Sequence, residues 1–192
     1  MNEVLENIMH RRSVRSYKPD PIPRNILDKI IEAGNMAPTG VGRQPWRFVV
    51  VEDPEFKRKL SQVAFMFLKG GESPEIYKLL KYMQARYEEP IYHSAPVILF
   101  VIGTATASPT HLKDAEAIDC ALVSQNIMLA ACSLGIGSCM VGLGSMGLKD
   151  DPEIVEALGL KEDETLYIPI VLGYPDHYPE PPRKKPPVVT WI

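Results

Sequence analysis

Three arginines and a serine lie within five consecutive positions near the start of this 192-residue chain, in the run RRSVR at residues 11–15. Guanidinium groups bind phosphate oxygens through paired hydrogen bonds, and a small hydroxyl adds a further donor. Apolar residues at helical spacing over 4–9 precede the run, so its donors would gather at a helix end. Two interpretations are open: a phosphate site, or a basic turn that faces solvent.

The overall charge argues against a general nucleic-acid-binding protein. Lys and Arg total 21 against 24 Asp and Glu, for a formal net charge of -3, whereas binding to nucleic acid requires a basic field. The length predicts one domain with a single substantial core. No apolar stretch reaches the roughly 20 residues of a membrane helix, and the first residues lack a signal-peptide core, so we expect no membrane contact and a cytoplasmic location.

The cysteines and histidines predict no metal site. Cys120 and Cys132 fall on one expected helix about 18 Å apart, beyond disulfide reach, and Cys139 has no CxxC partner. The four histidines show none of the spacings of metal-binding helices. We therefore expect three structural thiols in a reducing compartment.

Caps and apolar periodicity predict the secondary structure. Helix starts are expected at Asp53-Pro54, Ser73-Pro74 and Asp151-Pro152, where a capping side chain precedes a proline at the first helical position. We expect helices over 4–9, from after Pro23 to near Gly34, over 54–68, from 74 until Pro90 ends it, from His111 to Leu134, and over 152–158, and strands over 46–51, 97–102, 138–141 and 166–172.

A literal GxGxxG occurs at residues 142–147, directly after an expected strand. In a dinucleotide-binding fold the helix begins inside such a triplet and binds pyrophosphate at its N-terminus. Here Asp150, Asp151 and Pro152 begin a short helix only after the glycines, and its acids would repel phosphate. We favour a glycine-rich turn whose backbone N–H groups face a flat or anionic ligand.

The last 19 residues, 174–192, form a segment that we call the C-terminal arm. Six prolines between 175 and 187 predict an extended path over a surface. The arm carries a second cationic cluster at 183–185, and both clusters are explained if they bind one phosphate. Its apolar end, 188–192, would cover either the chain's own core or a partner subunit.

Four segments of the sequence, in the same order, resemble the FMN-dependent nitroreductase family. They are RRSVRSY at 11–17, APTGVGRQPWRFVVV at 37–51, SLGIGSCMVGLGS at 133–145, and VLGYP at 171–175 with PPRKK behind it. The resemblance implies an α+β fold with a central, mostly antiparallel sheet flanked by helices. It further implies an intertwined homodimer in which 1–173 is a single FMN-binding domain and 174–192 is its arm.

The resemblance also implies which residues bind the cofactor. Arg11 and Ser13, joined by Arg183 and Lys185 from the arm, match the residues that bind the FMN phosphate. Arg12 matches a position along the ribityl chain or the flavin edge.

A second set matches residues around the flavin ring. Arg15 corresponds to the cation near flavin N1 and O2, where reduction places negative charge. Gly142 and Leu143 match the turn whose backbone N–H meets flavin N5. The loop that covers the flavin from the partner subunit corresponds to Pro38, Thr39 and Gly40.

The activity implied is that of an FMN-dependent NAD(P)H oxidoreductase, which uses NADH or NADPH to reduce a nitroaromatic, a quinone or a similar small acceptor by a ping-pong hydride mechanism. The flavin carries that chemistry, so no side chain is assigned as catalytic. Gly42 stands where many members have asparagine, and Tyr77, Tyr82 and Tyr87 would either stack on substrate or pack their helix. A flavin-independent NAD(P)-binding enzyme using residues 142–147, and a non-enzymatic dimeric module that binds an anionic partner, remain open alternatives.

Overall fold

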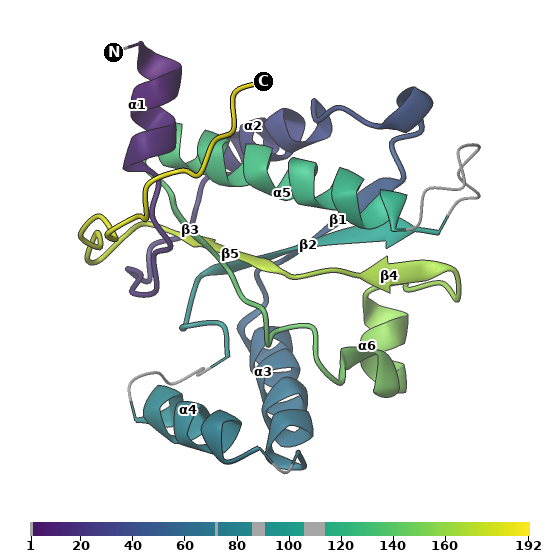
Figure 1. The fold of residues 1–192 in the computed structure, drawn as a ribbon. Helices are drawn as coiled ribbons and strands as arrows, with labels where there is room; N and C mark the ends of the chain where they lie inside the picture. The colour runs from purple at the N-terminus through teal and green to yellow at the C-terminus, as the bar shows by residue number, and fades with distance from the viewer. Residues whose placement is uncertain (1, 72, 86–90, 106–113) are drawn as a thin grey trace.

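A five-stranded antiparallel sheet forms the centre of the protein, with helices on both of its faces (Figure 1). The computed structural model describes residues 2–71, 73–85, 91–105 and 114–192, apart from the side chain of residue 77. The strand order is β1-β2-β5-β3, β4 also pairs with β2, and each pair is antiparallel. The predicted α+β class is confirmed. The strands are β1 (Trp46–Val51), β2 (Val97–Thr104), β3 (Gly137–Met140), β4 (Glu164–Leu166) and β5 (Ile170–Gly173).

The helices divide between the two faces of the sheet (Figure 1). One face carries α1 (Glu3–His10), α2 (Arg24–Asn35) and α5 (Ala115–Ser133). The other carries α3 (Pro54–Lys69), α4 (Pro74–Gln84) and α6 (Pro152–Ala157). Two short 3-10 helices, η1 (Gly40–Gly42) and η2 (Leu148–Asp150), lie in connections.

The predicted helix starts are confirmed by their cap hydrogen bonds. The side chain of Asp53 accepts from the N–H of Phe56, and that of Asp151 accepts from the N–H of Ile154. Ser73 caps α4 in the same way. The expected end of α4 at Pro90 and the expected start of α5 at His111 lie outside the described residues.

Strand β2 is buried on both faces and separates two hydrophobic clusters. Ile98 and Phe100 pack with the cluster that contains Leu60 of α3, while Leu99 packs with the cluster that contains Ile127 of α5. This alternation follows from the two-residue period of a strand. A strand covered on both faces therefore reads as a continuous apolar run.

Helix α5 packs closely against α2. A Cβ at Gly34 of α2 would lie 2.6 Å from Ile127 Cγ1, so a small residue is required at this crossing. In the part of the chain that the structure describes, α5 alone is long and apolar enough to cross a membrane, a test that core helices of water-soluble proteins also pass. Its outward residues Ile118 and Leu122 are exposed, so one side of α5 is in the core and the other presents apolar surface.

The predicted single strand over 166–172 is wrong. It is divided into β4 and β5, with residues 167–169 outside any strand. Between the pairs Ile102↔Leu166 and Leu99↔Ile170, three steps along β2 match four along the partner. Pro169 lies in this bulge because it has no N–H to donate to a ladder.

The C-terminal arm is extended, as its prolines predict, and contains no helix or strand. Its last residues are apolar and yet open to solvent, with 91% of Trp191 and 99% of Val188 exposed. The hypothesis that this end covers the chain's own core therefore does not hold.

Candidate anion and cofactor site

The arginine segment runs from the end of α1 to the edge of the sheet. Val14 fixes it there: its side chain is fully buried, and its N–H donates to the carbonyl of Ser138 in β3 at 3.0 Å. A Cβ at Gly137 would lie 2.9 Å from the Val14 side chain, so this glycine permits the close approach. With Val14 pointing inward, the flanking Ser13 and Arg15 are both available to line a pocket.

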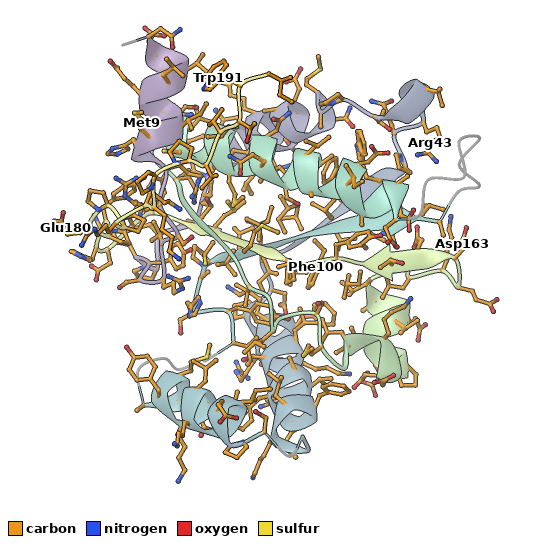
Figure 2. All side chains as sticks on the ribbon, in the orientation of Figure 1. Met9, Arg43, Phe100, Asp163, Glu180 and Trp191 are labelled. Carbon is orange, nitrogen blue, oxygen red and sulfur yellow. The ribbon has the colours of Figure 1, made fainter. Side chains whose placement is uncertain are left out.

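That pocket, with a volume of about 550 Å³, lies between the arginine segment and the arm. A cavity of this size is within the range of small-molecule sites. The end of α1 and the arginine segment form one wall, and the arm forms the other; Figure 2 shows Met9 and Glu180 on this side of the molecule. The lining residues are Ile8, Met9, Arg11, Arg12, Ser13, Arg15, Pro179, Glu180, Pro181, Pro182 and Lys184.

The three arginines of the segment differ in their partners. Among the described residues, no carboxylate forms an ion pair with Arg11 or Arg15. The guanidinium of Arg12 instead turns back on α1, where it donates to the carbonyls of Met9 and His10 at 2.6 and 2.9 Å. Arg12 thus satisfies carbonyls at a helix C-terminus, while Arg11 and Arg15 keep donors for a ligand.

His93 and Cys139 lie beside Arg15, and sequence reasoning missed both. Burial, and then the positive charge of Arg15, lower the pKa of His93 to about 4, so its imidazole is neutral near pH 7. Burial raises the pKa of Cys139, although Arg15 and a hydrogen bond with Ser13 oppose this rise. Neither group adds a negative charge. Among the described residues, Glu180 is the one carboxylate in the lining, against the cations of Arg11, Arg12, Arg15 and Lys184, so the pocket carries an excess of positive charge.

The structure brings together part of the cationic set expected from the sequence. Arg11, Ser13 and Arg15 line one pocket with the arm. From the arm, however, Lys184 lines the pocket, whereas Arg183 and Lys185 do not. In an extended chain neighbouring side chains point to opposite sides, and the sequence does not reveal which of three adjacent cations faces inward.

The glycine turn follows β3 without opening a helix. The next α-helix, α6, begins only at Pro152, so residues 142–147 lack the dinucleotide-binding context. The hydroxyl of Tyr92 donates to the carbonyl of Gly144, and a Cβ on that glycine would lie 2.7 Å from the Tyr92 ring. Gly142 is exposed and Leu143 half-buried, but neither lines the pocket described above.

The loop at 38–40 lies on the side of the folded protein opposite the arginine pocket. Figure 2 shows Arg43, just beyond this loop, on the side of the molecule opposite Glu180. Thr39 donates to the buried Asp119 of α5 at 2.9 Å, and Arg43 pairs with the same carboxylate at 3.5 Å. Pro38, Thr39 and Gly40 therefore do not meet the arginine pocket of their own chain.

The candidate metal ligands, cysteines and tyrosines add little to the description of the site. The described residues contain no cluster of three metal-ligating side chains, and Cys120, Cys132 and Cys139 are free thiols. Tyr82 is exposed on α4. The side chain of Tyr77 and the whole of Tyr87 lie outside the described residues.

Comparison with known proteins gives consistent matches over the chain. The model of the nitroreductase family matches residues 8–174. An NADH dehydrogenase of Thermus thermophilus is 33% identical over 95% of this chain and 93% of its own, and an FMN reductase [NAD(P)H] of Bacillus subtilis is 27% identical over 95% and 70%. A nitroreductase with bound FMN from Desulfitobacterium hafniense has a TM-score of 0.84 and 27% identity, covering 100% of this chain and 99% of that one.

Proposed function

Because the chain belongs to the nitroreductase family, we propose that it is an FMN-dependent NAD(P)H oxidoreductase that reduces nitroaromatics, quinones or similar small acceptors. The observation that carries the proposal is the arginine pocket, in which Arg11 and Arg15 have no carboxylate ion-pair partner among the described residues and Ser13 adds a hydroxyl. Related proteins whose names include FMN support the same cofactor here.

The residues of the pocket suit a phosphate monoester. Arg11 and Ser13 supply charge-assisted and neutral hydrogen bonds, and Lys184 adds a cation from the arm. A dianion needs several cations to offset the loss of its hydration. Arg183 and Lys185 lie beside Lys184 and would add charge from outside the pocket.

Arg15 is the residue assigned to the flavin ring. When bound, FMN would supply the redox chemistry, which is hydride transfer between NAD(P)H and the acceptor. Arg15 provides a fixed positive charge where the ring gains negative charge. The neutral His93 beside it adds no negative charge, and the backbone at Gly142 and Leu143 would face the ring edge.

We further propose a homodimer with two cofactor sites at its interface. Each chain carries the arginine pocket at one end and the loop at 38–40 at the other, so one chain alone does not close the site. Apolar side chains lie exposed over the surface that a second subunit would cover. They are Met36, Val41, Ile118, Leu122, Val189 and Trp191.

The proposal is tested by purifying the protein and recording its flavin absorbance before and after incubation with FMN. We expect a stoichiometric flavin complex that NADH or NADPH bleaches and that a nitroaromatic reoxidises. Arg11→Ala should bind FMN more weakly, whereas Arg24→Ala, which removes an exposed arginine paired with Asp28 on α2, should bind it as wild type does. A third variant, Gly142→Val, changes the glycine turn. The fold has room for it, because an added Cβ at this position meets nothing within 4 Å.

Two results would overturn the assignment. A protein that stays colourless after incubation with FMN is not a flavoprotein. NAD(P)H binding that is abolished by Gly142→Val and unaffected by Arg11→Ala would instead indicate a flavin-independent enzyme.

A further inference from the structure

The C-terminal arm is fastened to the body of the protein at two points before it reaches the pocket. At its base, the Lys18 N–H donates to the carbonyl of Tyr174 and the Asp176 N–H to that of Ser16, at 2.9 and 3.0 Å. The second point is Tyr178. Beyond it, residues 180–192 are exposed, so Tyr178 is the last firm attachment before the arm crosses the pocket.

Tyr178 contacts both helices that border the arm. Its ring stacks on His10 at the end of α1, with centroids 4.8 Å apart and planes 11° from parallel. Its hydroxyl donates to the His10 carbonyl at 3.0 Å and lies 3.6 Å from Cys132 Sγ of α5. The α1 side of this contact is itself held to α5, because the Asn7 amide donates to the carbonyl of Leu129.

The residues that follow Tyr178 form the outer wall of the arginine pocket. Pro179, Glu180, Pro181, Pro182 and Lys184 line it opposite Arg11, Ser13 and Arg15. A proline-rich segment is stiff over several residues, so the direction that it takes at residue 178 determines where Lys184 lies. An unfastened arm would remove one wall and one cation from the pocket.

We propose that Tyr178 is a positioning residue that holds the arm closed over the phosphate pocket, so that arm docking and phosphate binding stabilise each other. The nature of the ligand rests on the proposed function, but the fastening itself does not. Linkage requires that a ligand which contacts the closed arm also protects the arm. Tyr178 thus acts on the phosphate end of the ligand and not on the redox ring.

The first experiment measures arm docking without any ligand. Trypsin can cut the Arg183–Lys184 and Lys184–Lys185 bonds, while Pro186 protects the bond after Lys185. We expect Tyr178→Ala to be cut there about tenfold faster than wild type, because the closed state protects bonds in proportion to its population. Tyr178→Phe keeps the ring stack but loses the hydroxyl, so its cleavage rate should lie between those of wild type and Tyr178→Ala. His177→Ala, a change at the neighbouring exposed residue, is the matched control.

The second experiment compares FMN with riboflavin, which lacks the phosphate. Tyr178→Ala should weaken FMN binding by about tenfold, because the pocket loses a preorganised wall. Its affinity for riboflavin should equal that of wild type. Bound FMN should slow arm cleavage in wild type more than in the variant. An equal loss of affinity for both flavins would indicate general damage to the site and overturn the phosphate-specific role.

The two experiments can fail independently. Equal cleavage rates for Tyr178→Ala and wild type would overturn the fastening, whatever the cofactor. If Tyr178→Ala is cleaved faster than wild type but wild type does not bind FMN, the fastening by Tyr178 is supported and the proposed function is overturned.

Discussion

Two arginine sites of this chain have opposite electrostatic designs. Arg47 of β1 donates to both carboxylate oxygens of Glu164 at 2.7 Å, and also to the carbonyls of Leu158 and Gly159. Glu164 is 2% exposed, and its hydrogen bond with Arg47 holds its pKa at about 2. The Nε and Nη2 groups of Arg47 both have partners within the protein, so the pair joins β1, β4 and the end of α6.

At the other end of the sheet, the arginine pocket keeps an excess of positive charge, with Glu180 as the one carboxylate that the structure describes in its lining. Arg11 and Arg15 have no ion-pair partner among the described residues, and the buried neighbours His93 and Cys139 are neutral near pH 7. Holding an excess of like charges together lowers the stability of the empty protein. The comparison separates an arginine whose charge is paired within the fold from the arginines that we propose bind an anion.

Breaking the Arg47 pair should have the largest effect on stability. Arg47→Met leaves the Glu164 carboxylate buried without its cation, so the free energy of unfolding should fall by about 3–5 kcal/mol. Denaturant unfolding checks this value. Adding Glu164→Gln to the variant should recover part of the loss. The pair stabilises the fold above about pH 4.5 and loses this effect as pH falls toward 2, so wild type and variant should converge in acid.

Arg11→Ala should produce the reverse pattern. Loss of one charge-assisted contact should weaken FMN by about 10-fold to 100-fold, while the unfolding free energy of the flavin-free protein stays within about 0.5 kcal/mol of wild type. Flavin fluorescence titration and denaturant unfolding measure the two quantities. A large loss of stability here would erase the contrast with Arg47.

His93 should make the pocket end sensitive to mild acid. Its pKa of about 4 in the folded protein lies below the ordinary 6.5, so the unfolded chain binds the proton more readily. Stability should therefore fall by about 2.5 kcal/mol as pH drops from 6.5 to 4, and His93→Gln should remove that part of the pH dependence. Unfolding curves at several pH values test this. Parallel curves for the two proteins would show that His93 does not resist protonation.

Local sequence signals predicted the elements well and their junctions less well. The caps at Asp53, Ser73 and Asp151 depend only on residues within one helical turn, so they can be predicted from the local sequence. The bulge at Pro169 depends on pairing with β2. The antiparallel order of the strands followed from the family resemblance, since the succession of elements alone also allowed a parallel sheet.

The candidate site shows the same division. Arg11, Ser13 and Arg15 were predicted together because they are adjacent in sequence. The roles of His93 and Tyr178 depend on contacts across 46 or more positions, which no local pattern encodes. Arg12 was expected along the cofactor, yet the free carbonyls at the end of α1 engage its guanidinium in the structure.

The smallest predicted effect compares two adjacent lysines of the arm. Lys184 lines the pocket and Lys185 does not, so Lys184→Ala should weaken FMN by about threefold to fivefold, and Lys185→Ala by less than about twofold. Both side chains are exposed, so both effects should shrink with added salt, because screening acts on solvated charges. Titrations at low and high salt measure them. A larger loss of FMN affinity in Lys185→Ala than in Lys184→Ala would mean that the arm lies on the pocket in another register. The pocket wall that Tyr178 is proposed to hold would then consist of other residues of the arm.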